Sequence, residues 1–177
     1  MKYMFASDVH GSAYYCRKML DAYKEEKAER LVLLGDLLYH GPRNDLPREY
    51  APKQVISMLN DMKKEIYAVR GNCEAEVDQM VLQFPVMADY CILNLDGRTF
   101  YATHGHIYNE NNLPPIQEGD ILIHGHTHVL KAEQKEGYVL LNPGSVSIPK
   151  EGNPPTYAIS EDGVFTCLIY TSPSPRD

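Results

Sequence analysis

Long hydrophobic runs are missing from this chain. No segment approaches the roughly 20 consecutive apolar residues that a membrane-spanning helix needs. The N-terminus reaches the carboxylate of Asp8 after only a few apolar residues, whereas a signal peptide has a longer apolar core and a small-residue cleavage site. We therefore expect a protein that neither spans a membrane nor carries a secretion signal.

Cysteine and positive charge are also scarce. The chain has four cysteines and no Cys-x-x-Cys pair, which favours a reduced, cytoplasmic protein. Its 17 Lys and Arg residues are outnumbered by 24 Asp and Glu residues, for a net charge of −7. No overall field then attracts nucleic acid or an anionic membrane, so general nucleic-acid binding is not expected. Small phosphorylated substrates are not excluded, because bound metal ions can supply local positive charge.

The length and composition are those of an ordinary globular domain. The 177 residues suffice for one domain, which can bury roughly 70% of its unfolded surface. We expect residues 1–170 to form that single domain, because no internal repeat or long linker divides them. Residues 171–177 contain two Xaa-Pro steps, which disfavour a helix and remove strand hydrogen-bond donors. We expect this tail to be unstructured or foreign to the fold.

Strand and helix signals alternate in the first half of the chain. The apolar runs cover 3–7, 30–34 and 65–69, and apolar residues at helical spacing cover 12–27 and 55–62. This alternation predicts a parallel sheet with right-handed crossovers. Functional sites in such sheets collect at the carboxyl ends of the strands. Asp8, Asp36 and Asn72 all fall at such ends.

The second half reads mainly as strands. The candidate strands cover 90–95, 98–103, 121–124, 138–141, 156–160 and 164–169. Asp-Gly and Glu-Gly pairs supply turns between them, and helix signals are sparse. We therefore expect a second sheet stacked on the first, with helices outside. The fold class is an α/β sandwich of two stacked mixed sheets flanked by helices.

Histidine is the most informative residue type. Six of the seven histidines lie in three short clusters beside glycine, namely 8–10, 104–106 and 124–128. His40 follows Asp36 by four residues, and Asn72 follows Gly71. Together these segments supply the carboxylate, amide and imidazole ligands that a two-metal hydrolytic site requires. For each residue alone, the ordinary alternative is a turn, a cap or core packing.

These motifs occur in the order of a known family. Asp8-x-His10, Gly35-Asp36, Gly71-Asn72, His104-Gly105-His106 and Gly125-His126-Thr127-His128 resemble the motifs of the calcineurin-like metallophosphoesterases. Residues 40–44, 72–78 and 142–149 are similar to one subgroup, the bacterial YfcE-type phosphodiesterases. The resemblance covers residues 1 to about 168. Any one motif is weak, but five in register are highly specific.

The resemblance implies two divalent metal ions. One ion would be held by Asp8, His10 and His128, the other by Asn72, His104 and His126, and Asp36 would bridge them. A mixed His, Asp and Asn set suits Mn²⁺, Zn²⁺, Fe²⁺ or Ni²⁺ better than Ca²⁺, and we take Mn²⁺ as the first choice. Asp36, Asn72 and His104 would then also be catalytic residues.

Five further residues lie near the expected ligands and have other expected roles. Cys73 stands where many family members have a histidine that serves as general acid, and a thiol is a poorer hydrogen-bond donor than imidazolium. We nevertheless expect Cys73 to be catalytic. His40 and Arg43 would contact the substrate phosphate, with a solvated loop as the alternative. His106 would either support His104 or simply pack, and His124 would fill space behind the ligands.

The resemblance implies a hydrolase that acts on phosphodiesters. In the expected mechanism, a hydroxide activated by the two metals attacks phosphorus in line, and both ions stabilise the charge. The substrate would be a small phosphodiester. The alternatives are a phosphomonoesterase and a non-catalytic interaction scaffold on the same fold, as in the retromer subunit of this superfamily. The resemblance also implies a homo-oligomer, although nothing in the sequence sets the number of subunits.

Overall fold

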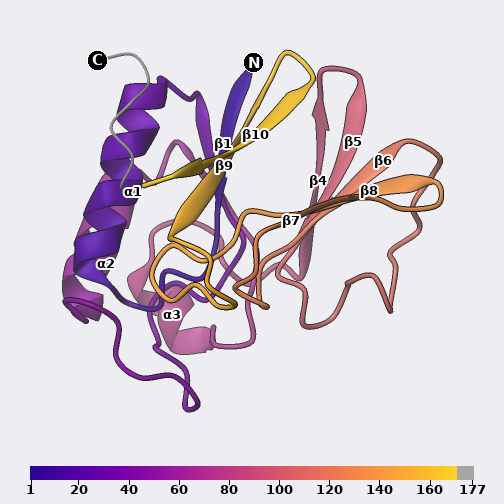
Figure 1. Cartoon of the computed structure of the whole chain (residues 1–177). Coiled ribbons are helices and arrows are strands. Elements are labelled where there is room, and N and C mark those ends of the chain that lie inside the picture. Colours follow the sequence, from indigo (N-terminus) through magenta and orange to yellow (C-terminus); the bar gives the residue numbers. More distant parts are fainter. Residues whose placement is uncertain (171–177) are drawn as a thin grey trace.

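Two five-stranded sheets stack against each other in this protein (Figure 1). The structure is a computed structural model and describes residues 1–170, so the predicted tail over 171–177 lies outside the described residues. Helices α1 (Ala13–Glu26) and α2 (Pro52–Asp61) lie on the outer face of the first sheet. The predicted α/β sandwich of two mixed sheets is confirmed. Within residues 1–170, no helix covers the outer face of the second sheet.

The first sheet has the order β10-β9-β1-β2-β3. Its strands are β1 (Lys2–Ala6), β2 (Arg30–Leu33), β3 (Ile66–Ala68), β9 (Thr156–Glu161) and β10 (Val164–Ile169). As predicted, β1, β2 and β3 are parallel. The expectation that residues 156–160 and 164–169 belong to the second sheet was wrong: as β9 and β10 they join this sheet, where β9 pairs antiparallel with β1.

The second sheet has the order β4-β5-β6-β8-β7. Its strands are β4 (Tyr90–Leu95), β5 (Arg98–Thr103), β6 (Asp120–Ile123), β7 (Lys131–Gln134) and β8 (Tyr138–Asn142). The pairs β5–β6 and β6–β8 are parallel, whereas β4–β5 and β7–β8 are antiparallel. Strand β7 was not predicted because its side chains are polar and mostly exposed at the sheet edge, so no apolar alternation marks it.

The helices begin where the local chemistry favours a start. The hydroxyl of Ser12 accepts the N–H of Tyr15 at 3.2 Å and so caps α1. Pro52 opens α2 at a position where a missing N–H costs nothing. The short helix α3 (Glu76–Val81) was not predicted, because six residues are too few to show a helical apolar stripe.

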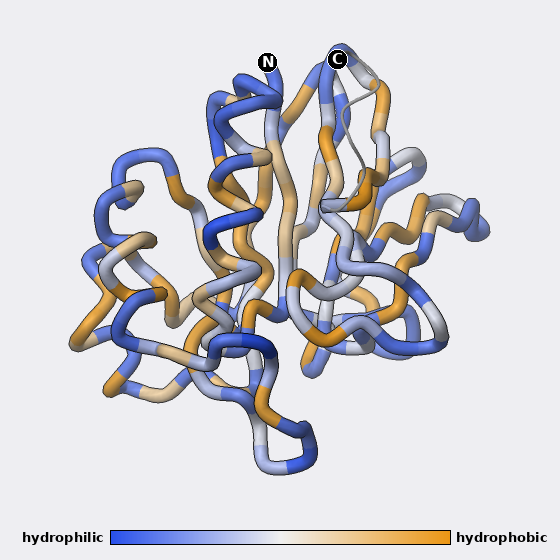
Figure 2. The backbone as a smooth tube through the Cα atoms, turned by 60° about the vertical axis from the view of Figure 1, so that its left-hand side comes forward, coloured by the Kyte–Doolittle hydropathy of each residue, from blue (hydrophilic) through white to orange (hydrophobic). Residues whose placement is uncertain are grey.

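Alternation along the strands of the first sheet fills two apolar layers. Met4 and Leu33 point toward the helices, whereas Phe5 and Val32 point toward the second sheet. Phe5 stacks on Phe100 of β5 with ring centroids 5.7 Å apart, which joins the two sheets. Figure 2 shows hydrophobic residues along the central strands and mostly hydrophilic residues in the projecting loops. Within residues 1–170, no helix is long and apolar enough to cross a membrane.

Candidate metal centre

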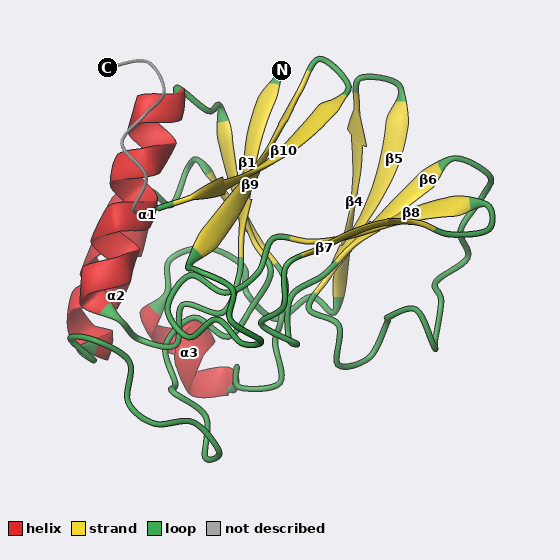
Figure 3. Ribbon diagram, viewed as in Figure 1, coloured by secondary structure: helices red, strands yellow, loops and turns green. Residues whose placement is uncertain are grey.

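The predicted ligands lie in loops that leave the carboxyl ends of parallel strands. Asp8 follows β1, Asp36 follows β2 and Asn72 follows β3, while His104 follows β5 and two further histidines follow β6. Figure 3 shows loops from both sheets gathered at this end of the sandwich. The topology therefore brings five distant segments of the chain together, as the sequence predicted for the first sheet.

The backbone at the ligands is held in a conformation that most residues avoid. Asp8, His10, Asp36, His126 and His128 all have positive φ, with values of 59°, 48°, 57°, 68° and 59°. Side chains other than glycine occupy this left-handed region infrequently, and clusters of such residues occur at functional sites. The surrounding loops thus stabilise a strained geometry that turns these side chains toward one another.

Two glycines make room for the ligand carboxylates. A Cβ atom on Gly71 would lie 2.6 Å from the backbone nitrogen of Asp36, and one on Gly125 would lie 2.6 Å from Oδ2 of Asp8. Real Cβ atoms do not approach so closely, so these positions require glycine. The Gly-Asn and Gly-His pairs of the sequence are thereby explained by close packing rather than by φ.

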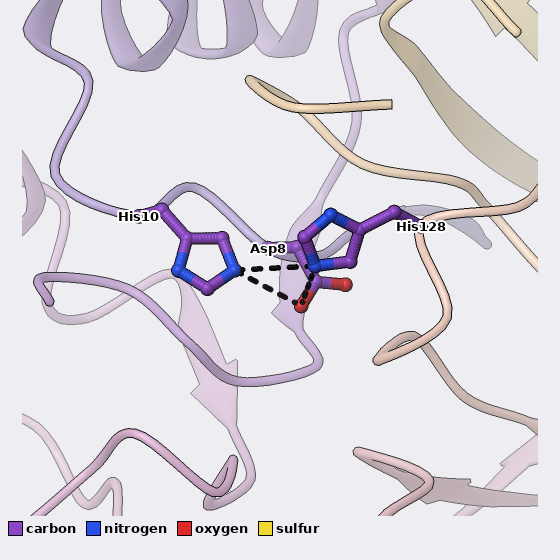
Figure 4. Close-up of side chains that lie close together, drawn as sticks. All are labelled: Asp8, His10 and His128. Carbon is purple, nitrogen blue, oxygen red and sulfur yellow. Dashed lines mark hydrogen bonds and ion pairs between the residues drawn. The ribbon is translucent and has the colours of Figure 1, made fainter. Parts of the chain in front are cut away.

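The first cluster consists of Asp8, His10 and His128 (Figure 4). Oδ1 of Asp8 lies 3.3 Å from Nε2 of His128 and 3.5 Å from Nε2 of His10. The two Nε2 atoms lie 3.3 Å from each other. All three side chains are at most 4% exposed. These are the residues predicted to hold one metal.

The second cluster consists of Asp36, His104 and His126, with Asn72 beside it. Nε2 of His104 lies 3.0 Å from Oδ1 of Asn72, 3.2 Å from Nδ1 of His126 and 3.3 Å from Oδ2 of Asp36. His104 is buried, whereas Asn72 is exposed. These four residues are the predicted second ligand set together with the predicted bridge.

Asp36 lies between the clusters. Its Oδ2 atom is 3.3 Å from Nε2 of His104 and 3.7 Å from Nε2 of His10. Its Oδ1 atom accepts the backbone N–H of Cys73 at 2.9 Å, which fixes the rotation of the carboxylate. One oxygen of Asp36 therefore faces both clusters, which is the position that a bridging ligand needs.

Three of the histidines are oriented by backbone carbonyl groups. In each ring Nδ1 contacts a carbonyl oxygen and leaves Nε2 facing the centre. The pairs are His10 with Tyr39 at 2.8 Å, His104 with Leu34 at 2.6 Å, and His128 with Ile148 at 2.7 Å. Because Nδ1 is the donor in each pair, Nε2 of the neutral ring is an unprotonated lone pair suited to a metal.

The donor set fits divalent cations. Oδ1 of Asp8 is buried and has no hydrogen-bond partner within residues 1–170, although it faces two imidazoles. The lone pairs of His10 and His128 also point at each other, which is unfavourable without a positive charge between them. Burial alone lowers the pKa of His104, but Asp36 and Asp8 outweigh it and raise that pKa to about 9. The same carboxylates attract a metal ion.

A second layer of polar groups, which the sequence did not reveal, holds the ligands in place. The hydroxyl of Ser7 donates to Oδ2 of Asp8 at 2.8 Å, and the hydroxyl of Ser145 donates to the carbonyl of Asp8 at 2.9 Å. The buried carboxylate of Glu74 accepts the N–H of Asp36 at 2.9 Å. The only signal for Glu74 was its place two residues after Asn72 in a segment that resembles the YfcE-type subgroup.

A cavity of about 310 Å³ opens over the two clusters. Arg43 and Cys73 line it, and so does Lys150, which the sequence analysis missed. His40 is not among its lining residues; its ring packs edge-on against Tyr50, with centroids 5.3 Å apart.

The two remaining histidines lie beside the ligands. The ring of His106 contacts the ring of His104, with centroids 5.4 Å apart. His124 is buried, and its Nδ1 lies 2.9 Å from the carbonyl oxygen of Gly125. Neither is part of the two clusters described above.

Buried His and Asp clusters of this kind, at the strand ends of a two-sheet sandwich, are typical of dinuclear metallophosphoesterases. The sequence model of the calcineurin-like phosphoesterase superfamily domain matches residues 1–162. This chain belongs to that superfamily.

Individual relatives are similar over almost the whole chain. Phosphodiesterase YfcE of Escherichia coli K12 is 45% identical over 174 residues, which are 98% of this chain and 95% of that protein. The solved structure of Yfce, described as a phosphoesterase from E. coli, has a TM-score of 0.95 over 97% of this chain and 94% of that one. Vacuolar Protein Sorting 29 from Cryptosporidium parvum, at 18% identity and a TM-score of 0.60 over 94% and 95% of the two chains, shares the fold.

Proposed function

We propose that this protein is a metal-dependent phosphodiesterase with a dinuclear centre. Asp8, His10 and His128 would hold one divalent ion. His104, His126 and Asn72 would hold the other, and Asp36 would serve as the ligand common to both. The observation that carries the proposal is the position of Asp36, whose Oδ2 lies 3.3 Å from His104 in one cluster and 3.7 Å from His10 in the other.

When bound, two adjacent ions supply an activated water nucleophile and stabilise charge on the phosphoryl oxygens. The protein contributes orientation. Backbone carbonyl groups hold the imidazoles of His10 and His104 so that Nε2 of each ring faces the centre. Asn72 is exposed and lines the cavity, so its amide would be accessible both to a metal and to the substrate. We take Mn²⁺ as the resident metal, with Zn²⁺, Fe²⁺ or Ni²⁺ as alternatives.

Cys73 is the proposed proton donor to the leaving group. Its thiol lies within 4.8 Å of ligand atoms of His10 and Asp36, and it lines the cavity. Burial, followed by the charge of Asp36, raises the pKa of Cys73 far above its ordinary value, so the thiol keeps its proton at neutral pH. A general acid works best with a pKa near the working pH, so it is the position of the thiol at the cavity, and not its raised pKa, that supports this role.

Diester hydrolysis is favoured over the two alternatives. Phosphodiesterase YfcE of Escherichia coli K12 is 45% identical over nearly the full chain. All seven predicted donors converge here, and five of them have the positive φ values that cluster at functional sites, which supports a catalytic metal centre.

The test compares two esters with the same leaving group. Metal-free protein should hydrolyse neither bis-p-nitrophenyl phosphate nor p-nitrophenyl phosphate, and addition of Mn²⁺ should restore turnover mainly of the diester. Preference for the monoester would make the protein a phosphomonoesterase. No turnover of either ester with any of Mn²⁺, Zn²⁺, Fe²⁺ or Ni²⁺ would contradict the phosphodiesterase proposal.

Self-association is a further proposal from the resemblance. The chain has a mass of 20.1 kDa, so a homo-oligomer should give a mass that is a multiple of this value by light scattering. A species of that single mass at micromolar concentration would remove the proposal.

A further inference from the structure

Two cationic side chains line the cavity together with the candidate metal ligands. Arg43 comes from the loop between β2 and α2, and Lys150 comes from the loop between β8 and β9. Both residues are exposed, and within residues 1–170 neither side chain forms an ion pair or hydrogen bond. Other cations, such as Arg17 and Arg70, are paired with carboxylates. Arg43 and Lys150 are thus available to an anion in the cavity.

The backbone of both residues is tied to the metal centre. The N–H of Lys150 donates to the carbonyl of His128, a candidate ligand, at 3.0 Å. Arg43 lies in a turn in which the N–H of Asn44 donates to the carbonyl of Gly41 at 3.3 Å. A Cβ atom on Gly41 would lie 3.7 Å from Sγ of Cys73, so this turn lies against the centre. The backbone of each cationic residue is therefore held at the edge of the cavity, although the side chains themselves are long.

The remaining lining residues present no large apolar side chain to a ligand. Apart from the metal ligands and the two cations, the cavity is lined by small or polar residues such as Pro42, Asn44 and Thr127. It contains no Phe, Tyr, Leu, Ile, Val or Met side chain. Stacking of a base needs an aromatic face, and ligand pockets are usually lined by apolar side chains. This lining favours neither a nucleobase nor an acyl chain.

The local charge calls for more negative charge than a simple diester has. The four positive charges of two divalent ions would be balanced by Asp8, Asp36, the activated hydroxide and the single charge of a phosphodiester. Arg43 and Lys150 then add positive charge that a simple diester leaves unbalanced. In a chain with a net charge of −7, this local concentration of positive charge marks the cavity as a site for polyanions.

We propose that the cavity selects phosphodiesters in which one of the two esterified groups is small and carries a further negative charge, a carboxylate or a phosphate, that Arg43 and Lys150 bind. This inference rests on the proposed phosphodiesterase function. It concerns the specificity of that site, so it can fail while the phosphodiesterase activity stands.

The direct test uses p-nitrophenyl phosphodiesters that differ only in the retained group. With Mn²⁺-loaded protein, the 2-carboxyethyl and 2-phosphoethyl esters should have kcat/KM about tenfold above that of the methyl ester, mainly through KM. The choline ester, whose retained group is cationic, should fall below the methyl ester. The two anionic esters distinguish a carboxylate from a phosphate as the preferred charge. A thymidine ester is included to test for recognition of a nucleobase. The inference would be overturned if the thymidine or choline ester had the highest kcat/KM, or if all esters had equal kcat/KM.

Variants assign the preference to the two side chains. Arg43→Gln and Lys150→Gln should each lower the anionic-to-methyl ratio of kcat/KM about threefold, and the double variant should bring it near one. Lys24→Gln, an exposed lysine of α1 outside the cavity, is the matched control and should keep the ratio. Calorimetric binding of the corresponding non-hydrolysable phosphonates should show the same order without turnover. An unchanged ratio in the double variant, with its melting temperature unaltered, would contradict the assignment.

If none of the esters is hydrolysed, the phosphodiesterase proposal itself fails and takes this inference with it. If all are hydrolysed but the preference is absent, only the charge selection fails. Ionic strength gives an independent check: the preference should shrink as it rises from about 0.01 M to about 1 M, because exposed charges are screened.

Discussion

The buried carboxylate of Glu74 accepts the backbone N–H of Asp36 at 2.9 Å. It also accepts the N–H of Leu37 at 2.7 Å and that of Gly71 at 2.5 Å. One side chain thus ties the loop after β2 to the loop after β3. Burial, and next the charge of Asp36, raise the pKa of Glu74 to about 7. We infer that Glu74 is a positioning residue for the candidate bridge.

Glu74→Gln should weaken this connection. The amide carries no charge, and its NH₂ group would face backbone donors, so at least one buried N–H loses its acceptor. We expect a loss of about 1–3 kcal/mol in the free energy of unfolding, measured with urea, and a weaker affinity for metal. Glu76→Gln changes the same residue type two positions on, at an exposed site, and should cost less than about 0.5 kcal/mol. Equal stability losses in the two variants would contradict the positioning role.

Cys73→Ser should separate acid catalysis from metal binding. A serine hydroxyl keeps the size of the group and leaves the bond from the N–H of residue 73 to Asp36 intact. Both metals should remain bound, and kcat should fall mainly for alkyl diesters with poor leaving groups, which need a proton.

The measurement for Cys73→Ser compares aryl and alkyl diesters in the same variant, together with metal content by elemental analysis. An equal loss for both classes would show that Cys73 is not the proton donor. A loss of metal would instead make the thiol a ligand or a structural group.

The free energy of unfolding of the metal-free protein should depend on pH through the titration of His104. Asp36 and Asp8 raise its pKa from 6.5 to about 9, in spite of burial. Between these values the folded state holds a proton that the unfolded chain releases, so the free energy of unfolding should fall as pH rises across that window. Metal ions must displace the same proton, so metal affinity should rise over the same window.

Two measurements check this linkage. Urea unfolding in the presence of a chelator should show lower stability at about pH 9 than at about pH 6.5. Calorimetric titration with Mn²⁺ in buffers of different ionisation enthalpy should show proton release on binding. Stability that increases with pH in the chelated protein, or binding without proton release, would go against the assigned coupling.

The sequence could predict most of the candidate site because the proposed ligands follow strand ends. Asp8 and Asp36 each directly follow an apolar run, and parallel strands place such residues at one edge. His126 and His128 came instead from the family motif, since the pairing of β6 into the second sheet is not readable from spacing. A polar residue at the end of an apolar strand can thus be recognised from a short stretch of sequence. How the two sheets pack together depends on long-range contacts and cannot be recognised in this way.

Other features could not be predicted from the sequence because no local pattern of residues indicates them. Strands β9 and β10 alternate like those before them, and only long-range packing sets the sheet that they join. The link from Glu74 to Asp36 spans 38 positions, and Lys150 reaches the cavity only through the folded loop after β8. Neither contact has a sequence spacing that distinguishes it from an ordinary surface charge.

The dinuclear proposal depends most directly on Asp36. Burial alone raises its pKa, but the hydrogen bond and charge of His104 outweigh this and hold the carboxyl in its charged form. Asp36→Asn removes that charge from the oxygen that faces both clusters. His126→Gln, by contrast, removes one ligand of the second cluster only.

Metal stoichiometry and turnover of Asp36→Asn in excess Mn²⁺ therefore test the account. We expect folded protein with both sites weakened and phosphodiester turnover reduced by at least about 10²-fold, whereas His126→Gln should weaken mainly one site. A folded Asp36→Asn protein that binds two metals and keeps near-normal turnover would contradict the two-metal assignment.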